Sequence, residues 1–375
     1  MAHALAAKMG TLAQGIVAGS TEQSAQVAGF RYFAGGHPLP NAESLRAGAA
    51  ITRALRGMTD DSLVLYLISG GASSMVEAPI DPDITLDDLI ATHRVLVLSG
   101  APIIEINAIR KHLSAVKGGR LAAVAAVAQQ VSVLVSDVPD SALDALASGP
   151  TMPDPSTTDQ CYRVALQYGM LERFPPAVRE LFQRRALEET PKPGDPLFHR
   201  SRWWPVLSNA TAVKAAAAAA AECGFAVDID NSCDDWDYAR AADHLLERLR
   251  ERRRAEPRLC LISGGEVTVE VKQGDGVGGR NQHFALYCAQ KIAGDNITVL
   301  SAGTDGIDGN SLAAGAVVDG STLERARAQQ LEPESALARF DSHPLFRALG
   351  DALVTGPTGN NLRDLRILLS WAPPS

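Results

Sequence analysis

Short apolar runs alternate with longer amphipathic segments along most of this chain, and this alternation limits the folds that it can adopt. Short runs of this kind are typical of buried strands, whereas the longer segments repeat apolar residues at helical spacing. Strands alternating with helices predict an α/β fold with mostly parallel pairing. The expected strands are residues 63–68, 131–135, 205–207, 226–229, 259–262, 267–271, 297–300 and 367–369, and the expected helices include 86–98, 103–116, 210–223, 238–253 and 281–292.

Chain length and proline content divide the chain into two predicted domains. Its 375 residues exceed what one hydrophobic core usually holds. Residues 149–202 are rich in proline and have no clear strand pattern, so we interpret them as a helical crossover that ends the first domain. The predicted domains are residues 1–200 and 201–375. Within the second, residues 267–279 have the alternation and the glycines of a β-hairpin.

Charge and cysteine content exclude several classes of function. The formal net charge of −8 does not fit a nucleic-acid surface, and the basic run at 248–254 is typical of a solvated helix face. The five cysteines contain no C-x-x-C pair, so neither a disulfide framework nor a zinc site is indicated. No apolar run approaches the roughly 20 residues of a membrane span. We therefore predict a cytoplasmic protein with reduced cysteines and without a nucleic-acid or membrane partner.

Glycine and small polar residues follow nearly every expected strand. The five letters LISGG even occur twice, at residues 67–71 and 261–265. In open parallel sheets ligands bind at the carboxyl ends of strands, and glycine-rich turns there expose N–H groups that hold anions. Turns of an ordinary α/β protein are the alternative, but so many loops at one edge favour a phosphate or carboxylate site. The candidate residues are Ser69, Gly70, Gly71, Ser73, Ser74, Ser263, Gly264, Gly265, Gly303 and Thr304.

Few charged residues stand beside these loops. Asp137, Asp305 and Asp308 follow expected strands, and each carboxylate can either hold Mg²⁺ with waters and phosphate or cap a turn. Glu266 follows the second LISGG, where it can orient a cation or a hydroxyl group.

The expected helix at 103–116 has a basic face. Its Asn107, Arg110 and Lys111 fit an anion-binding face and a solvated face about equally well. For Lys117 and Arg120, just beyond that helix, a solvated face is the better interpretation.

A single G-x-G-x-x-G occurs at Gly274, Gly276 and Gly279, and no Walker A pattern is present. Since no strand with an acidic residue follows at dinucleotide-binding spacing, we interpret these glycines as a turn. This turn would place Arg280 and Asn281 at a helix N-terminus, which is itself an anion site.

Segments spread over nearly the full chain carry a resemblance to a known family. They are GGHPLPNAESLRAG, LISGGASSMVEAP, LSGAPIIEINAIRKHLSAVKGGRLA, SDVPDSALDALASGPTMPDP, ETPKPGDPLF, SGGEVTVEV, GVGGRNQHFAL, SAGTDGIDGNSLAAGAVVDG and GDALVTGPTGNNLRDLRILL. With them the chain resembles the type II glycerate 2-kinases, whose C-terminal part is the MOFRL domain. The resemblance implies a Rossmann-like N-terminal domain, a MOFRL-type α/β domain with a mixed sheet, and an active site in the cleft between them.

The resemblance also implies an activity. It is the transfer of the γ-phosphoryl group of ATP to the 2-hydroxyl of D-glycerate, with Mg²⁺. Arg280 would be the cation at the transferred phosphoryl group or the substrate carboxylate. Asp137 or Asp305 would be the base near the 2-hydroxyl, and either of these, or Asp308, the metal ligand. A homodimer is left open.

Two other functions remain open at this point. Some proteins of this type carry the label hydroxypyruvate reductase, which would require NAD(P)H. A non-catalytic protein that binds nucleotides or small anions is the third interpretation.

The chain departs from the family pattern at two places. Family members have a Gly-Lys-Ala segment with a functional lysine, and this sequence starts with what resembles the helix after it; no lysine here matches, Lys8 included. We therefore expect either a start codon further upstream or a weak enzyme whose first sheet has an unpaired edge. The second departure is Ala72, which stands where the family usually has a third glycine after the serine.

Overall fold

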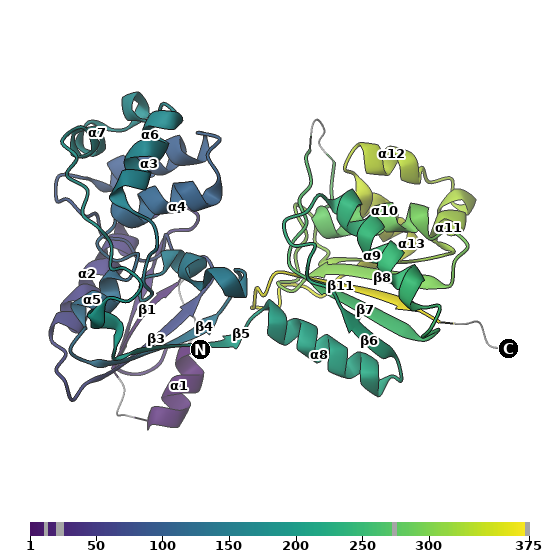
Figure 1. The fold of residues 1–375 in the computed structure, drawn as a ribbon, viewed down its shortest axis with the longest axis horizontal. Coiled ribbons are helices and arrows are strands. Elements are labelled where there is room, and N and C mark those ends of the chain that lie inside the picture. The colour runs from purple at the N-terminus through teal and green to yellow at the C-terminus, as the bar shows by residue number, and fades with distance from the viewer. Residues whose placement is uncertain (11–13, 20–25, 272–275, 372–375) are drawn as a thin grey trace. The chain divides into compact units, whose positions relative to one another are not determined.

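The chain forms two compact units of helices and strands in the computed structural model, which describes residues 1–10, 14–19, 26–271 and 276–371. Unit 1 comprises Met1–Leu134 and Ser141–Val206, and unit 2 comprises Val135–Asp140 and Leu207–Ser375. Both units combine helices with sheets (Figure 1), so the predicted α/β class is confirmed. No helix of the described residues is long and apolar enough to cross a membrane.

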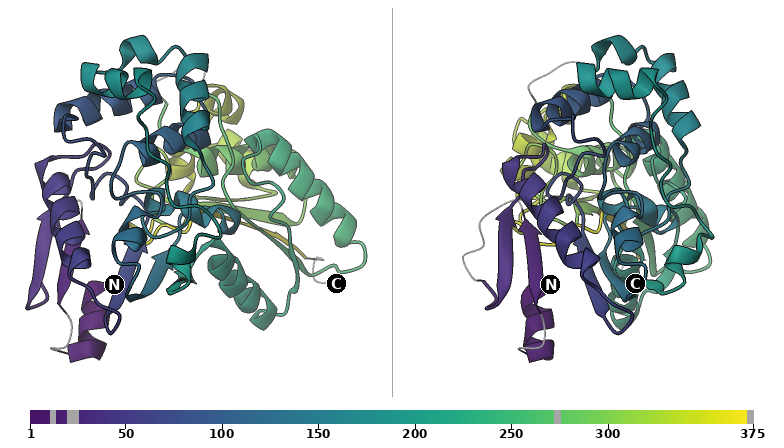
Figure 2. Two further views of the ribbon diagram at one scale, coloured as in Figure 1. Left: turned by 60° about the vertical axis from the view of Figure 1, so that its left-hand side comes forward. Right: turned by 90° about the vertical axis from the view of Figure 1, so that its left-hand side faces the viewer.

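Unit 1 contains two separate sheets. The strands β1 (Gly15–Gly19) and β2 (Phe30–Ala34) form a parallel pair that the sequence pattern did not predict. Helix α2 (Ala42–Arg56) packs against both strands, as Figure 2 shows. The second sheet has the order β3 (Leu63–Ser69), β4 (Gln129–Val135) and β5 (Ser201–Leu207).

A layer of helices forms most of the core of unit 1. The helices α3, α4, α6 and α7 pack on one another through a shared cluster of buried residues that includes Leu96, Ile109, Val164 and Phe182. Residues 149–202, predicted as a helical crossover, supply α6 and α7. The helices of unit 1 are α1 (Ala2–Met9), α2, α3 (Leu86–Val97), α4 (Ile103–His112), α5 (Arg120–Val124), α6 (Thr158–Gln167) and α7 (Pro176–Gln183), with 3₁₀ turns at Asp140–Ser148, Leu171–Arg173 and Pro196–Phe198.

Unit 2 is built on a six-stranded mixed sheet in the order β10-β9-β8-β11-β7-β6. Strand β11 is antiparallel to both β7 and β8, so these two strands point the same way and end at the same edge. At that edge Asp364, the first residue of β11, lies opposite Gly303, the last residue of β8. The strands are β6 (Ala226–Ile229), β7 (Leu259–Gly264), β8 (Ile297–Gly303), β9 (Gly315–Asp319), β10 (Ala352–Leu353) and β11 (Asp364–Ser370).

Helices cover both faces of this sheet, which explains why all residues of β7 are buried. Cys260 and Ile262 pack toward α8, whereas Leu259 and Leu261 pack into the larger cluster with α9 and α10, because successive side chains on a strand point to opposite faces. Figure 1 shows α8 on one face and α9 and α10 on the other. The helices are α8 (Asn209–Glu222), α9 (Tyr238–Arg252), α10 (Arg280–Lys291), α11 (Thr322–Ala328), α12 (Pro333–Ala338) and α13 (Ser342–Leu349).

The predicted strand at 267–271 is wrong. Thr268 forms an isolated parallel bridge with Asp237, its N–H donating to the carbonyl of Trp236 at 2.8 Å. Gly265 has a φ of 93° and turns the chain away from β7, whose two neighbours in the sheet are β11 and β6. The turn of the expected hairpin, with Gly274, lies outside the described residues.

Candidate active site

The first LISGG ends in a glycine turn in unit 1. Gly71 has a φ of 76°, a conformation that costs any residue with a Cβ atom. Ser69 and Gly70 are partly buried, and Ser74, in the loop that follows β3, is buried.

Arg110 is the cation of this loop. It projects from α4, and its Nη2 donates to Ser73 Oγ at 3.4 Å. Burial lowers the pKa of Arg110, and the negative charge of Glu77 opposes that effect. Within the part of the chain that the structure describes, Arg110 has no ion-pair partner, and its buried Nε has no hydrogen-bond partner. The first loop therefore carries a positive charge that is not neutralised by direct contact.

Glu77, whose negative charge acts on Arg110, is itself paired with a lysine. Lys117 forms an ion pair with Glu77, and both side chains are 2% exposed. Ser114 Oγ donates to Glu77 at 2.6 Å. The predicted solvated position of Lys117 is wrong, because this ammonium group is paired inside the unit. Arg120, for which the same was expected, has only 14% of its side chain exposed.

Lys111 and Asn107 lie on the same helix but differ from Arg110. The ammonium group of Lys111 is buried between Asp144 at 2.9 Å and Asp154 at 3.1 Å. These contacts favour a structural role for Lys111. Asn107 is half-buried on α4.

The second LISGG also ends in a glycine with positive φ, but it remains in strand β7 as far as Gly264, whereas β3 ends at Ser69. Gly265 has a φ of 93°, and a Cβ atom added to Gly264 would lie 1.9 Å from Asn209 Oδ1. Asn209, the first residue of α8, also donates to the carbonyls of Leu362 and Asp364 at 2.8 and 2.9 Å. The end of β7 is thus tied to the start of β11, with Ser263 buried beside them.

Arg280 lies at the start of α10 and is held by two carboxylates. Its Nε donates to Asp364 Oδ2 at 2.5 Å and its Nη2 to Asp364 Oδ1 at 3.0 Å. Nη2 also lies 2.6 Å from Glu266 Oε1. Burial alone would lower the pKa of Arg280, but the hydrogen bonds and charges of these carboxylates raise it above its ordinary value. For Glu266 the main effect is burial, which raises its pKa.

Asp308 caps helix α10. Its carboxylate accepts hydrogen bonds from the backbone N–H groups of Asn281 and Gln282 and from both of their side-chain amides. A carboxylate has about four lone-pair sites, so little capacity remains for a metal ion. The contacts favour the capping alternative for Asp308, and Asn281 is buried in the same network. The expected anion site at this helix N-terminus is therefore filled by the protein's own carboxylate, with Gly279 packed against it.

Asp305 lies at the end of β8. Its Oδ1 accepts the N–H of Ile307 at 3.0 Å, and a Cβ atom added to Gly303 would lie 2.9 Å from it. The same added atom would lie 3.5 Å from Asp364 Oδ1, so the two carboxylates flank Gly303. Thr304 Oγ1 donates to the carbonyl of Arg363 at 2.8 Å.

Asp137 belongs to unit 2, and its pKa is affected by the charge of Arg363, the residue directly before β11. Burial raises the pKa of Asp137, and the positive charge of Arg363 opposes that effect. Arg363 in turn makes two bonds of 2.6 Å to Asp234 and has a φ of 69°. Such backbone conformations are costly for residues with a side chain, and they persist only where surrounding contacts hold them.

Unit 1 therefore contains Ser69–Ser74 and Arg110. Unit 2 contains Asp137, the second LISGG with Glu266, residues 279–281 and residues 303–308.

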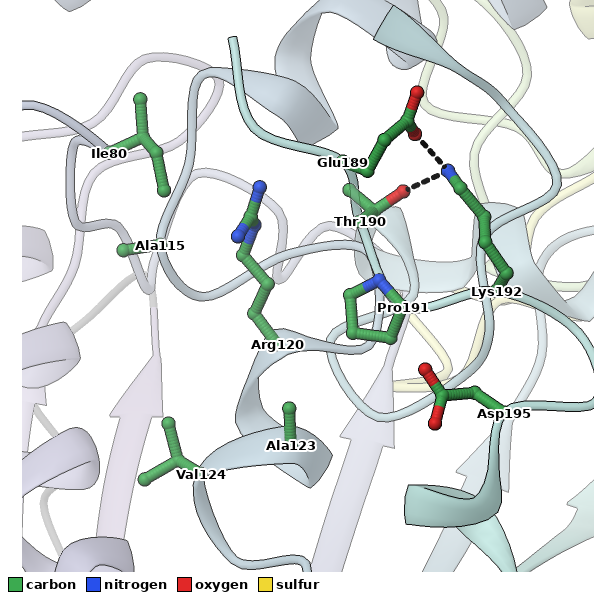
Figure 3. A pocket seen from close by; sticks show the side chains of 10 residues that line it. All are labelled: Ile80, Ala115, Arg120, Ala123, Val124, Glu189, Thr190, Pro191, Lys192 and Asp195. Atoms are coloured by element: carbon green, nitrogen blue, oxygen red, sulfur yellow. Dashed lines mark hydrogen bonds and ion pairs between the residues drawn. The ribbon is translucent and has the colours of Figure 1, made fainter.

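A separate cavity of 650 Å³ in unit 1 involves none of the predicted site residues. Figure 3 shows that its lining residues include Arg120 and the ion pair of Lys192 with Glu189.

Comparison with known proteins identifies the family to which this chain belongs. Residues 1–183 match the domain of unknown function DUF4147, and residues 259–364 match the MOFRL family. The chain is 36% identical over 345 residues to a D-glycerate 2-kinase of Thermotoga maritima, covering 90% of this chain and 79% of that protein. The chain belongs to the MOFRL-containing glycerate kinase family.

Further relatives of this glycerate kinase family member agree with that assignment, although one carries another name. The crystal structure of a glycerate kinase from Thermotoga maritima matches with a TM-score of 0.89 at 33% identity, covering 99% of this chain and 88% of that one. A protein of Agrobacterium vitis, provisionally named hydroxypyruvate reductase, is 38% identical, covering 89% of this chain and 76% of that protein.

Sequence reasoning missed three charged residues in the site of this family member. They are Asp234, Arg363 and Asp364, which hold Arg280 or the segment beside it. The segment NNLRDL belongs to the family resemblance, but its charges precede a strand, where the rule for parallel sheets predicts no ligand. Because β11 is antiparallel, its beginning lies at the edge where β7 and β8 end.

Proposed function

We propose that this chain is a glycerate 2-kinase that transfers the γ-phosphoryl group of ATP to the 2-hydroxyl of D-glycerate. The observation that carries the proposal is the 36% identity over 90% of the chain to a protein named D-glycerate 2-kinase. Phosphoryl transfer requires little covalent help from a protein, but it requires alignment and positive charge around the transferred group. Arg280 and the glycine turns of both units are suited to supply them.

We assign Arg110 and Arg280 different tasks in this reaction. Arg110 lacks an ion-pair partner among the described residues, which suits it to bind an anionic group of a substrate directly. Arg280 sits among carboxylates and is held in one orientation, which suits it to meet charge that develops during transfer. The proposal requires the two loops to face one cleft between the units.

The carboxylates of unit 2 support a need for Mg²⁺. Glu266, Asp305 and Asp364 lie around Arg280 and Gly303, and they would repel a triphosphate. Magnesium is usually held by one or two carboxylates together with phosphates and waters, and it neutralises the charge of the phosphates. Of the predicted ligands Asp305 and Asp137 fit this role, whereas Asp308 is saturated by its four donors. Asp137 and Asp305 are both candidates for a base at the 2-hydroxyl.

The direct test is ATP consumption with D-glycerate, followed by identification of the product by phosphorus NMR. We expect 2-phosphoglycerate; the 3-phospho isomer would contradict the proposal. A cytoplasmic location and a homodimer remain predictions.

A hydroxypyruvate reductase is the second candidate, favoured by the provisional name of the Agrobacterium vitis relative. It would need a nicotinamide site, yet the first N–H groups of α10 already donate to Asp308. A fluorescence titration with NADH and NADPH decides this point, since saturable binding would favour the reductase. Stabilisation by ATP without turnover would instead favour a non-catalytic binding protein.

A further inference from the structure

The guanidinium group of Arg280 is bound along one side only. Three of its N–H groups are used: the Nε–H and one Nη2–H by Asp364, and the other Nη2–H by Glu266. A guanidinium group has five N–H donors, so the two that remain are both on Nη1. With 36% of its side chain exposed, Arg280 can offer these two to a ligand.

We propose that Asp364 is a positioning residue for phosphoryl transfer, which holds Arg280 so that only Nη1 meets the transferred group. This inference rests on the proposed kinase function. Asp364 itself touches neither substrate nor phosphate and acts through Arg280. Glu266 completes the hold by taking the remaining hydrogen of Nη2.

The position of Asp364 is fixed by contacts on every side. Its side chain is 1% exposed, and its backbone lies in β11 opposite Gly303 of β8. Its carbonyl accepts a hydrogen bond from Nδ2–H of Asn209, the first residue of α8. The preceding residue, Arg363, has the φ of 69° that its paired bonds to Asp234 maintain. A carboxylate held this firmly can fix the plane of a guanidinium group through two parallel bonds.

This arrangement changes what Arg280 can do. Its Nε–Nη2 side, which elsewhere would grip a carboxylate or phosphate in two bonds, is already used by the protein. Arg280 therefore donates to a ligand from a single nitrogen whose direction is set by Asp364. Small displacements of such a group cost about 10²-fold in rate.

The test is Asp364→Asn, which keeps the shape of the side chain and removes its charge. We expect kcat to fall about 10²-fold, while the KM for D-glycerate and the half-saturating Mg²⁺ concentration change much less. In an Arg280→Lys background the same change should alter the residual kcat by no more than about twofold, the usual scatter of independent effects. If Asp364 acts by positioning Arg280, its substitution has no further effect once Arg280 is replaced. If Asp364 has only a structural role, its substitution lowers kcat in both backgrounds.

Asp351→Asn is the matched control. Asp351 binds Arg325 through two bonds of 2.9 and 2.8 Å, and Arg325 is 37% exposed, close to the value for Arg280. Asp351 directly precedes β10. Arg325 also contacts Asp319, the last residue of β9, whereas Gly315 at the other end of β9 pairs with Ala302 of β8. The control pair therefore lies at the end of β9 that is away from the site. We expect this variant to keep the kcat of the wild type even where its melting temperature falls.

Several results would overturn the inference. They are an unchanged kcat in Asp364→Asn, a loss that persists undiminished in the Arg280→Lys background, or a raised Mg²⁺ requirement that accounts for the loss. If Asp364→Asn does not fold, Glu266→Gln is the second test, because Glu266 is half-buried and binds the other hydrogen of Nη2 of Arg280. We expect a smaller loss of kcat for Glu266→Gln, and we expect this loss to disappear in the Arg280→Lys background. A wild-type chain that transfers no phosphoryl group overturns the proposed function as well, whereas an active wild type with these negative results overturns only the role of Asp364.

Discussion

The same five residues, LISGG, end β3 in unit 1 and β7 in unit 2 and lead into the loop that follows each strand, but the charges around the two loops differ. The last glycine is left-handed in both, with φ of 76° at Gly71 and 93° at Gly265. Arg110, beside the first loop, has no ion-pair partner among the described residues. Arg280, beside the second, is bound by Asp364 and Glu266.

This difference teaches that the last glycine of a local motif permits the positive φ, but that the motif does not determine the charges around it. The turn follows from glycine, which reaches positive φ at little cost. The charge comes from residues distant in sequence, because Asp364 is 84 positions from Arg280. We infer that the first loop suits direct contact with an anion and the second suits an anion accompanied by a cation.

The largest effect is expected on the stability of unit 1, near the first loop, where Lys117 and Glu77 form a buried ion pair. Lys117→Met leaves Glu77 buried without its partner, and we expect it to lower the free energy of unfolding by about 3–5 kcal/mol. Urea denaturation measures this. Lys291→Met is the control, because its pair with Asp243 is exposed and should contribute at most about 1 kcal/mol. Equal losses in the two variants would contradict the buried role of Lys117.

The two arginines should separate in steady-state kinetics. Arg280→Met is expected to reduce kcat by about 10²–10³-fold, because it removes a donor aimed at charge that develops in the transition state. Arg110→Met should mainly raise a substrate KM, by the equivalent of about 1.5–3 kcal/mol for a lost charged hydrogen bond. Arg325→Met controls for the loss of a paired arginine away from the site. If the two variants affect kcat and KM in the same proportion, the division of tasks between the loops is wrong.

Substituting alanine for Gly71 or Gly265, the last glycine of each LISGG, compares how much each turn depends on glycine for its stability. Gly71→Ala should cost about 1–2 kcal/mol for the left-handed backbone, because its new Cβ atom would lie a tolerable 3.3 Å from His37. Gly265→Ala should cost more, because its Cβ atom would lie 2.6 Å from Asp234 Oδ1. Thermal unfolding of both variants measures the difference. The reverse order would mean that the second loop can move away from Asp234.

The smallest effect concerns His93, which lies near the cations of the first loop. Burial, with the charges of Arg110 and Lys117, lowers the pKa of His93 to about 3. The unfolded chain binds a proton near pH 6.5 and the folded chain does not, so stability should fall as the pH decreases below 6.5. The slope is about 0.7 kcal/mol per pH unit at pH 6.5 and approaches about 1.4 kcal/mol per pH unit near pH 5. Urea titrations between pH 6.5 and 5 should show a shallower fall for His93→Gln than for the wild type; parallel slopes would exclude this role.

The sequence by itself determined the α/β class, most of the strands, and the glycine turns at their carboxyl ends. These follow from local rules, since the spacing of apolar residues selects helix or strand and glycine permits the turn. It also carried the resemblance to glycerate kinases that the comparisons confirm.

Only the tertiary structure decided how each charged residue is used. It buried Lys117 against Glu77, saturated Asp308 at the start of α10, and brought Asp364 to Arg280 through the antiparallel strand β11. The physical reason is that the free energy of a charge depends on its burial and on partners distant in sequence. For Arg280 the direction of a strand decided the partner, and no local pattern of residues specifies that β11 runs between β7 and β8.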